Sequence, residues 1–518
     1  MIKMKKIIIF CLFYFNVGVA IQAQDCCYPD KDGMYSYYIN VKENNIKKSF
    51  SKDSLMHTLK KSKFFLNKDA KNYDKDIKVV YKSFPTAKTK LLQQSVTIRS
   101  YNSNLDIELS KYSDVFNFVE KICHPKDMLL YEPNDYSYLG EEASDHLDLI
   151  KAPQAWEITK SDSRILVGVT DNYIEPSHED LENKISQILC NGTTPDFHGI
   201  AVSGCAAAHT DNYKGLASIG FNSKIIFSSH WANDNEVLEM AQIPGVRVIN
   251  CSWINSCSYS STADALYQEI RDVHNVVLTF GAGNGVNHCG SLTAYVYPAS
   301  YESVICVTSV GHSTDYGTVL PIYGKHLWKD CHESTIGDSL SAYHHNDKVD
   351  ICAPGYRVVS PSLNNSYTNA WGTSFSAPIV AGVCALVASV NPCLTAAEIQ
   401  DIVISSADTT IYNIPENAAY IGLLGKGRID AYAAVKKAVE LGTVYIQNRT
   451  YNSTLVETAE TELKSGNSVT NLQPNGNVII ETGSNVTFRA TRSIELSPGF
   501  EVKLGATFNT EIYESPCF

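Results

Sequence analysis

The sequence has no excess of basic residues. Its 43 Lys and Arg residues are outnumbered by 55 Asp and Glu residues, and the net charge is −12. Binding to the phosphates of a nucleic acid requires a basic face, so this balance argues against a nucleic-acid partner. The acidic charge also serves ordinary solubility, which is the simpler explanation for it.

The sequence also lacks the common patterns of metal ligands. It contains no Cys-x-x-Cys pair or histidine cluster of the kind that binds zinc, and the doublet His344-His345 stands alone in a loop-like stretch. No loop carries acidic residues at the spacing of a calcium site. The residues alone therefore predict no metal site.

Long apolar runs are scarce, and the one near the N-terminus is short. Three lysines precede an apolar run from Ile7 to Phe15, and small residues follow up to Ala23. This layout predicts a secretory signal peptide over residues 1–23. The alternative, a membrane anchor, requires about 20 apolar residues. No other segment is long and apolar enough, so we expect an exported mature chain without a transmembrane segment, secreted or at the cell surface.

Cysteine, in contrast, is frequent for an ordinary chain, with 15 residues. An exported protein can form disulfides, but their pairing cannot be read from the sequence. Those in apolar stretches are predicted to be buried thiols: Cys251, Cys306, Cys352 and Cys384. Those in polar or turn-like surroundings are the better bridge candidates: Cys190, Cys257, Cys289, Cys331 and Cys393.

The length of 518 residues predicts several domains. Residues 24–140 mix strand-like and helical runs and predict a small α+β domain. Its expected strands are Tyr35–Val41, Ile77–Tyr81 and Ser95–Arg99, and its expected helices are Leu55–Ser62 and Val115–Ile122. The turn sequence Pro133-Asn134-Asp135 marks a boundary near its end.

Residues 141–441 alternate apolar strands with helical stretches. This order predicts an α/β domain with a mostly parallel sheet and helices on both faces. Functional residues of such a sheet lie at the carboxyl ends of its strands. The expected strands are 165–170, 224–228, 246–251, 276–280, 304–310 and 349–353. The expected helices are 147–156, 199–208, 237–241, 263–274, 375–390, 396–406 and 430–441.

Residues 442–518 change character. Short runs alternate apolar with polar residues between Gly and Pro, for example Val478-Ile-Ile, Val486-Thr-Phe and Phe500-Glu-Val. This pattern predicts a small all-β module.

Two polar residues lie at the ends of elements of the predicted α/β domain, one after a strand and one at the start of a helix. Asp171 ends the apolar run Ile165-Leu-Val-Gly-Val-Thr-Asp, where a poorly solvated carboxylate needs a partner such as an imidazole. Taken alone, it also suits a strand-end turn or a helix cap. His198 opens a helix rich in small residues, which can pack closely and hold the ring rigidly. A single histidine of this kind is more often structural.

The most specific string is Gly372-Thr-Ser-Phe-Ser-Ala-Pro. It predicts a tight turn into a buried helix, with Ser374 at the positive end and Pro378 in the first turn. A plain serine N-cap explains the position of Ser374 but not the whole string. Asn284 closes the run Val276 to Gly283, where its amide suits an oxyanion donor or a left-handed turn.

These four strings, in this order, resemble the subtilisin-like serine peptidases, or subtilases. Supporting matches are Tyr297-Pro-Ala-Ser, Ala353-Pro-Gly and Gly425-Lys-Gly-Arg-Ile-Asp-Ala. The resemblance implies a serine endopeptidase acting on protein or peptide substrates, with no cofactor required for the chemistry. It implies that Asp171 orients His198, that His198 is the general base, and that Ser374 is the nucleophile, with Asn284 in the oxyanion hole. The implied substrate cleft comprises Ser252, Trp253, Ile254, Gly281, Ala282 and Gly283.

Three neighbouring positions depart from the family pattern. Asn172-Tyr173 follows Asp171 where the family has Thr or Ser and Gly, and Ile200-Ala201 replaces the usual Thr-His after His198-Gly199. Ile254 stands where the family has glycine, which predicts a narrower primary specificity pocket. None removes a catalytic group. They leave two alternatives open, a peptidase with a narrow substrate and an inactive relative that binds peptides or a surface.

The same resemblance also implies roles for the regions before and after the α/β domain. Residues 24–140 occupy the place of a propeptide, so we expect a zymogen cleaved between about residues 128 and 145. A permanent accessory domain is the alternative. Many relatives use calcium to rigidify loops, so structural calcium is compatible with this reading. The string Ile494 to Phe508 resembles a β-repeat at the ends of exported bacterial proteins, consistent with a stability cap, a substrate-binding module or surface attachment.

Overall fold

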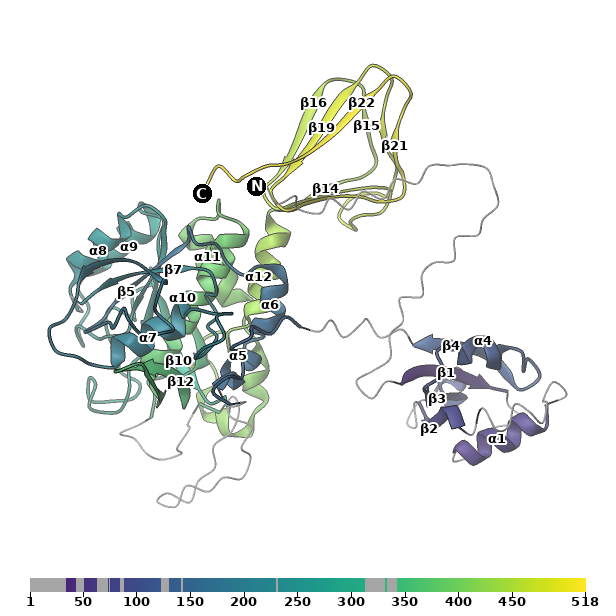
Figure 1. Cartoon of the computed structure of the whole chain (residues 1–518), viewed down its shortest axis with the longest axis horizontal. Coiled ribbons are helices and arrows are strands. Elements are labelled where there is room, and N and C mark those ends of the chain that lie inside the picture. Colours follow the sequence, from purple (N-terminus) through teal and green to yellow (C-terminus); the bar gives the residue numbers. More distant parts are fainter. Residues whose placement is uncertain are drawn as a thin grey trace. The chain divides into compact units, whose positions relative to one another are not determined.

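The computed structural model divides the chain into two compact units, Met1–Leu130 and Tyr131–Phe518 (Figure 1). The predicted signal peptide lies outside the described residues. The predicted limits 24–140, 141–441 and 442–518 remain predictions. The structure describes residues 34–42, 51–62, 73, 75–83, 88–122, 130–140, 143–229, 232–312, 331–332 and 342–518.

The first unit contains a four-stranded antiparallel sheet in the order β2-β3-β1-β4. Alternate residues of β1, such as Tyr37 and Ile39, are buried together with Leu55 and Leu59 of helix α1 and Leu105 of helix α4. The elements are β1 (Tyr35–Val41), α1 (Lys52–Lys60), β2 (Ile77–Lys82), α3 (Lys90–Gln93), β3 (Ser95–Ser100), α4 (Leu105–Ser110) and β4 (Phe116–Ile122).

One element of this unit was predicted wrongly. The segment predicted as a helix over Val115–Ile122 is the edge strand β4, which pairs with β1. Its residues Phe116, Phe118, Val119 and Ile122 belong to types that favour strands. Pairing with β1 outweighs the helical spacing of its apolar residues.

The second unit contains a seven-stranded sheet in the order β11-β10-β9-β8-β5-β7-β6. Every neighbouring pair is parallel, as predicted. The first strand of the sheet in the chain, β5, lies between β8 and β7, so the chain changes direction across the sheet beside it. The strands are β5 (Leu166–Thr170), β6 (Ile185–Cys190), β7 (Lys224–Ser228), β8 (Val246–Cys251), β9 (Val277–Gly281), β10 (Ile305–Val310) and β11 (Ile351–Pro354).

Helices cover both faces of this sheet, and alternate residues of each strand enter two separate cores. Val248 of β8 and Val277 of β9 face one core, whereas Ile249 and Leu278 face the other. The first core receives α5 (Asp145–Leu149), α6 (Ala152–Ile158), α7 (His198–Ala207), α10 (Thr373–Val390), α11 (Ala396–Ser405) and α12 (Ala431–Leu441). The second core receives α8 (Asp234–Ala241) and α9 (Ser261–Asp272). The hairpin β12 (Val358–Ser362) and β13 (Ser366–Ala370) and the 3-10 turns η3 (Thr409–Asn413) and η4 (Pro415–Tyr420) lie outside the sheet.

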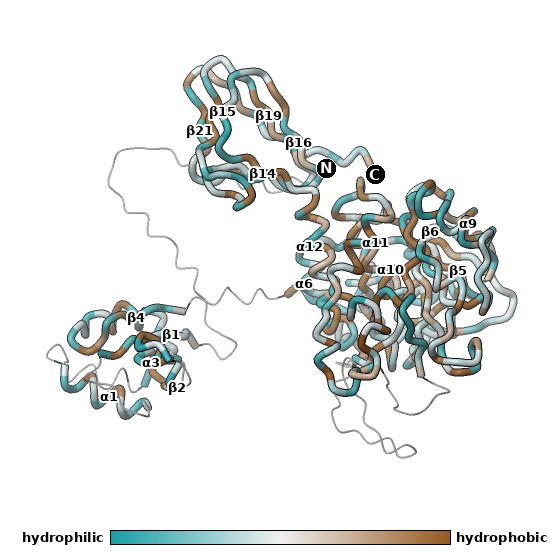
Figure 2. Tube along the Cα trace, turned by 180° about the vertical axis from the view of Figure 1, so that it is seen from behind, coloured by the Kyte–Doolittle hydropathy of each residue, from teal (hydrophilic) through white to brown (hydrophobic). Residues whose placement is uncertain are grey.

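The central helix α10 is apolar on all sides because it is surrounded by protein. By length and hydropathy, it is the one helix of the described residues that could cross a membrane. However, 89% of that window is buried within the protein, which is typical of a core helix. Figure 2 shows hydrophobic residues, in brown, around α10 and α11.

The C-terminal module is a three-sided parallel β-helix (Figure 1). Each side is a three-stranded parallel sheet, with orders β14-β17-β20, β15-β18-β21 and β16-β19-β22. Val478, Ile480, Val486 and Phe488 fill its interior. The strands are β14 (Val444–Ile446), β15 (Arg449–Tyr451), β16 (Leu455–Ala459), β17 (Glu462–Ser465), β18 (Val478–Ile480), β19 (Asn485–Ala490), β20 (Ser493–Leu496), β21 (Phe500–Val502) and β22 (Thr507–Ile512).

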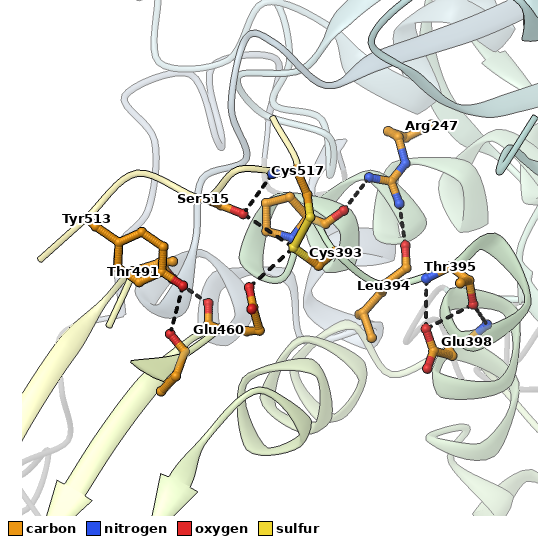
Figure 3. The surroundings of a disulfide bond; sticks show 12 residues. Arg247, Cys393, Leu394, Thr395, Glu398, Glu460, Thr491, Tyr513, Ser515 and Cys517 are labelled. Carbon is orange, nitrogen blue, oxygen red and sulfur yellow. Dashed lines mark hydrogen bonds between the residues drawn. A yellow bond between two sulfur atoms is a disulfide. The ribbon is translucent and has the colours of Figure 1, made fainter. Parts of the chain in front are cut away.

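The β-helix is fastened to the rest of the second unit. A disulfide joins Cys393, which precedes α11, to Cys517, which follows β22 (Figure 3). Arg492 donates a hydrogen bond to the carbonyl of Ile158 at 2.9 Å. The buried Thr461 hydroxyl donates to the carbonyl of Val439 at 2.6 Å.

The cysteine predictions can be compared with this structure. Cys251, Cys306, Cys352 and Cys384 are buried and belong to no disulfide of the described residues, as predicted. Three bridge candidates are bonded, Cys257 and Cys289 to each other and Cys393 to Cys517. Cys190 and Cys331 belong to no disulfide of the described residues, so their assignment as bridge candidates was wrong. Polar sequence surroundings carried no information on whether a second sulfur lies nearby.

Candidate active site

The predicted site residues come together where three strands end. Asp171 follows β5, Ser252 follows β8, and Gly281 is the last residue of β9. Two helix N-termini meet these strand ends, since His198 is the first residue of α7 and Ser374 the second residue of α10. A cavity of about 700 Å³ opens between them, and every predicted site residue except the buried Ala282 lines it.

Asp171 and His198 are in direct contact. Nδ1 of the imidazole lies 2.9 Å from both carboxylate oxygens of Asp171. The carboxylate is almost fully buried and also accepts the backbone N–H of Asn172 at 2.8 Å. A carboxylate can only accept in this pair, so the proton of the neutral ring lies on Nδ1 and Nε2 is left as the basic nitrogen.

This contact sets the pKa of His198. Burial alone would lower the pKa, because it disfavours the charged imidazolium. The charge of Asp171 and its hydrogen bond outweigh burial, so the pKa of His198 is raised above 6.5. Contact with Asp171 therefore stabilises the protonated form of the His198 ring.

The start of α7 is held from outside the helix. The first N–H groups of a helix have no partner within it. Here the side-chain oxygen of Asp196 accepts the N–H of His198 at 2.8 Å, and that of Asn172 accepts the N–H of Gly199 at 3.2 Å. The sequence identified Asn172 only as a departure from the family. The structure gives it a positioning contact, which no local sequence signal indicated because Asn172 and Gly199 are 27 positions apart.

Gly199 permits the close approach of α7 to the strand end. A Cβ atom at this position would lie 2.4 Å from the carbonyl oxygen of Tyr173 and 3.1 Å from a carboxylate oxygen of Asp171. Any side chain would therefore separate His198 from Asp171.

Ser374 lies in the first turn of α10. The preceding Gly372 has φ = 128°, a value that favours glycine. Within the described part of the chain, neither the Ser374 hydroxyl nor its backbone N–H makes a hydrogen bond. The ring of His198 packs against that of Phe375, with centroids 5.4 Å apart, which brings the imidazole to the start of α10. The described residues include no hydrogen bond between His198 and Ser374; such bonds are often long without substrate.

Pro378 was predicted in the first turn of α10, and this prediction was wrong. It occupies the sixth position of the helix. A helix that begins at Thr373 would receive a hydrogen bond from residue 378 to the carbonyl of Ser374. Proline has no N–H, so that carbonyl loses its helical donor. The hydroxyl of Ser252 donates to it instead at 2.7 Å, which ties the end of β8 to the serine.

The side-chain amide of Asn284 lies at the start of α10, beside Ser374. Its Oδ1 accepts the backbone N–H of Thr373 at 2.9 Å, which fixes the orientation of the amide. Nδ2 then makes no hydrogen bond to any described residue. It lies next to Gly372, where an added Cβ would come within 3.2 Å of it. Nδ2 and the Ser374 N–H are therefore two donors without partners in one cavity.

Two segments form the cavity walls, residues 252–257 after β8 and residues 281–289 at the end of β9. The Cys257–Cys289 disulfide joins them, a pairing that the sequence left open. Ile254 lines the cavity as expected from its position. Trp253 is anchored in the core, where its indole N–H donates to the hydroxyl of Thr170 at 2.9 Å.

The glycines of the second wall bring it against α10. A Cβ on Gly281 would lie 2.8 Å from the hydroxyl oxygen of Thr373. That hydroxyl oxygen also accepts the N–H of Gly283 at 3.1 Å. These contacts set the distance between Asn284 and Ser374.

Two buried carboxylates are the best candidate ligands for a cation. Asp135 and Asp180 are fully buried, and in the described residues one oxygen of each lacks a hydrogen-bond partner. Burial raises the pKa of both, that of Asp180 to about 8. No group of three His, Cys, Asp or Glu side chains gathers as a metal site in the described ranges. The second oxygen of each carboxylate accepts a backbone N–H at 3.2 Å, Asp135 that of Asn212 and Asp180 that of Leu216, so both contact the same stretch of chain with the oxygen donors that calcium prefers.

The fold and this cavity define a hydrolase of the serine peptidase class, and the comparisons with known proteins agree. The model described as "Subtilase family" matches residues 162–467, more than half of the chain, and the chain belongs to this family of serine endopeptidases.

Its known relatives include several bacterial peptidases. The "Thermophilic serine proteinase" of Bacillus sp. (strain AK1) is 27% identical over 353 residues, 65% of this chain and 75% of that protein. Thermitase of Thermoactinomyces vulgaris is 28% identical and covers 59% of this chain and 100% of its own length. Subtilisin DY of Bacillus licheniformis is 29% identical, over 56% of this chain and 97% of its own. A solved protease structure from Pseudoalteromonas arctica, 22% identical, covers 60% of this chain and 100% of its own with a TM-score of 0.46.

Proposed function

We propose that the chain is a secreted serine endopeptidase, made as a zymogen, that cleaves proteins or peptides through Asp171, His198 and Ser374. The observation that carries the proposal is the contact of His198 Nδ1 with the buried Asp171 carboxylate, 2.9 Å to each oxygen, in the cavity that Ser374 and Asn284 also line.

The chemistry follows from these positions. Ser374 Oγ attacks the peptide carbonyl as Nε2 of His198 takes its proton, and the buried Asp171 stabilises the imidazolium. The Asn284 amide and the Ser374 N–H donate to the oxyanion. His198 then gives the proton to the leaving amine, which leaves an acyl-enzyme on Ser374. A water molecule, deprotonated by the same ring, hydrolyses the ester and restores the serine.

Labelling with a fluorophosphonate tests this proposal. We expect the folded, trimmed protein to be labelled and the Ser374→Ala variant to remain unlabelled. Labelling that persists in the variant, or its absence in the folded native protein, would contradict the proposal. The second result would favour the inactive relative that binds peptides.

We place the zymogen cleavage in the early part of the predicted interval from 128 to 145. The contacts of residues 131–136 support this position. The side chain of Tyr131 donates to Asp211, Asp135 is fully buried, and Tyr136 packs edge-on against Trp156 in the core of the second unit. Cleavage after Asp135 would detach Tyr131 and Asp135 from the second unit and leave Tyr136, which packs on Trp156, as the new N-terminus. N-terminal sequencing of the active form should give a start between about residues 128 and 131, and a start near Gln24 would identify a permanent accessory domain.

The C-terminal β-helix is proposed to remain with the secreted enzyme as a cap on the peptidase domain, and surface attachment is its second candidate role. The disulfide and the hydrogen bonds of Arg492 and Thr461 support retention. Fractionation of an expressing culture distinguishes the roles. Full-length enzyme free in the medium supports the cap, whereas enzyme held at the cell surface supports attachment.

Calcium is proposed as a structural ion held by Asp180 and Asp135. Bound there, it would neutralise the buried carboxylates and fix the loops that carry them. Chelation should lower the melting temperature of the Ser374→Ala protein, and Asp180→Asn should remove this sensitivity. An unchanged melting temperature after chelation would reject the ion.

A further inference from the structure

The two walls of the cavity are rigid before any substrate arrives. The N–H groups of Asn255 and Ser256 both donate to the carbonyl of Tyr297, at 2.9 and 3.2 Å. The Cys257–Cys289 disulfide then fixes the first wall to the second. His288 lines the cavity immediately before this disulfide.

Most polar side chains of these walls are already engaged. The Ser252 hydroxyl donates to Ser374, the Asn255 amide to Asp234, and the Ser256 hydroxyl to the carbonyl of Ser258. Asn284 Nδ2 is the proposed oxyanion donor. Of the side chains that line the cavity from these two segments, this leaves His288 as the further nitrogen donor.

The tautomer of the neutral His288 ring follows from the hydrogen bond that it makes within the described part of the chain. Its Nδ1 accepts the backbone N–H of Asn284 at 3.3 Å. A nitrogen that accepts carries no proton, so the proton of the neutral ring lies on Nε2. Nε2 makes no hydrogen bond to any residue that the structure describes. The ring thus offers one N–H donor next to the proposed oxyanion donor.

We propose that His288 is a specificity-determining residue that donates from Nε2 to an oxygen in a substrate side chain. This rests on the proposed function. The substrates favoured carry glutamate or glutamine at one position beside the scissile bond. Neither wall contributes an acidic side chain to the cavity, and the Asp171 carboxylate, which also lines it, is paired with His198. His288 is exposed in the free enzyme, so an apolar side chain bound over the ring would displace water from the imidazole N–H and leave it without an acceptor.

Peptide series that differ only by Gln, Glu or Leu at each position flanking the scissile bond test the proposal. The specificity constant is measured for the native enzyme, His288→Ala, His288→Gln and the control Asn287→Ala, whose side chain is exposed and does not line the cavity. We expect the native enzyme to prefer Gln and Glu over Leu at one position by about tenfold, the effect of a hydrogen bond in a fitted site. His288→Ala should abolish the preference, His288→Gln should restore part of it, and Asn287→Ala should retain it.

The outcomes separate this inference from the proposed function. Fluorophosphonate titration counts active sites in every sample, so failure of the catalytic proposal appears as absent labelling. A fully labelled enzyme without the preference, or a preference that survives in His288→Ala, overturns the role of His288. A preference for Glu with Gln equal to Leu also overturns it, because charge and not the N–H donor would then select the substrate.

Discussion

The proposed triad depends on neighbours that make room for it. Gly199 allows the helix that carries His198 to reach Asp171, and Asn172 and Asp196 accept the free N–H groups at the start of that helix. The sequence predicted which four residues lie together, because the strings around them are specific. It did not reveal the role of Asn172, since that role depends on a contact across 27 residues of chain.

The activity is expected to fall at acidic pH with a midpoint above 6.5. The neutral His198 is the active base, and Asp171 raises its pKa above the ordinary value, so protonation begins at a higher pH. Asp171→Asn should move this acid limb to lower pH and reduce turnover by about 10⁴-fold. The pH profile of the specificity constant measures both effects. The surface variant Asp272→Asn serves as control, and an unmoved limb in Asp171→Asn would refute the assignment.

At the scale of elements, the apolar strands of the parallel sheet could be predicted because both of their faces are buried and they form continuous apolar runs. The edge strand β6 and the hairpin β12–β13 were missed, since β6 and β13 are partly exposed and the mostly buried β12 is a short strand that contains Ser and Pro. The C-terminal pattern predicted strands but not a parallel β-helix. Alternation of apolar and polar residues shows which side chains of a strand face the interior. The pairing of short strands that lie far apart in the sequence depends on the complete β-helix.

The Ser252 hydroxyl is expected to compensate for the missing N–H of Pro378. Ser252→Ala leaves the carbonyl of Ser374 without its donor and should destabilise the protein by about 1 kcal/mol. Pro378→Ala supplies a new N–H to that carbonyl, so the loss in the double variant should be smaller than the sum of the two single changes. Denaturant unfolding in the Ser374→Ala background, which cannot digest itself, measures this cycle. Additive losses would show that the two groups do not serve the same carbonyl.

At the scale of the whole molecule, the β-helix and the peptidase fold are joined at separate points in the chain. Arg164 lies before β5, yet its guanidinium pairs with Glu514 and stacks on the ring of Phe518 at 3.8 Å. Arg247 donates to the carbonyls of Pro392 and Leu394 beside the Cys393–Cys517 disulfide, as Figure 3 shows for Leu394. The sequence could not predict this association, because the contacts of Arg164 and Arg247 and the disulfide each join residues more than 100 positions apart.

Removing the Cys393–Cys517 disulfide should weaken this association. The bond closes a loop of 124 residues, for which chain entropy sets an upper limit of about 4–5 kcal/mol. The Cys393→Ser/Cys517→Ser variant should lose stability and expose the β-helix to added protease. Limited proteolysis of the Ser374→Ala background measures this, with the free, buried Cys384→Ala as a matched cysteine control. Equal resistance with and without the bond would mean that the noncovalent contacts suffice.

Stability should also depend on the buried His146. Its ring lies 5.8 Å from that of His312, and burial, with a smaller contribution from His312, lowers its pKa to about 3. The folded state therefore keeps His146 neutral at pH 5, whereas the unfolded chain protonates it below about 6.5. Acidification from pH 7 to 5 should cost up to about 2 kcal/mol through this residue.

The variant His146→Leu isolates that contribution. Its free energy of unfolding should fall less than that of the parent between pH 7 and 5, with both measured in the Ser374→Ala background. An identical fall in the two proteins would show that His146 is protonated without cost in the folded state. The exposed variant His57→Leu, in the first unit, is the control.

The covalent link between the cavity walls bears on how this enzyme could change over generations. Cys257 and Cys289 hold the spacing of the walls independently of the side chains that face the cavity. Substitutions at Ile254 or His288 can therefore alter the preferred substrate without collapsing the cleft or moving Asn284. Lineages that keep this pair of cysteines should change their substrate preference faster than those that lose it, while retaining peptide-bond hydrolysis.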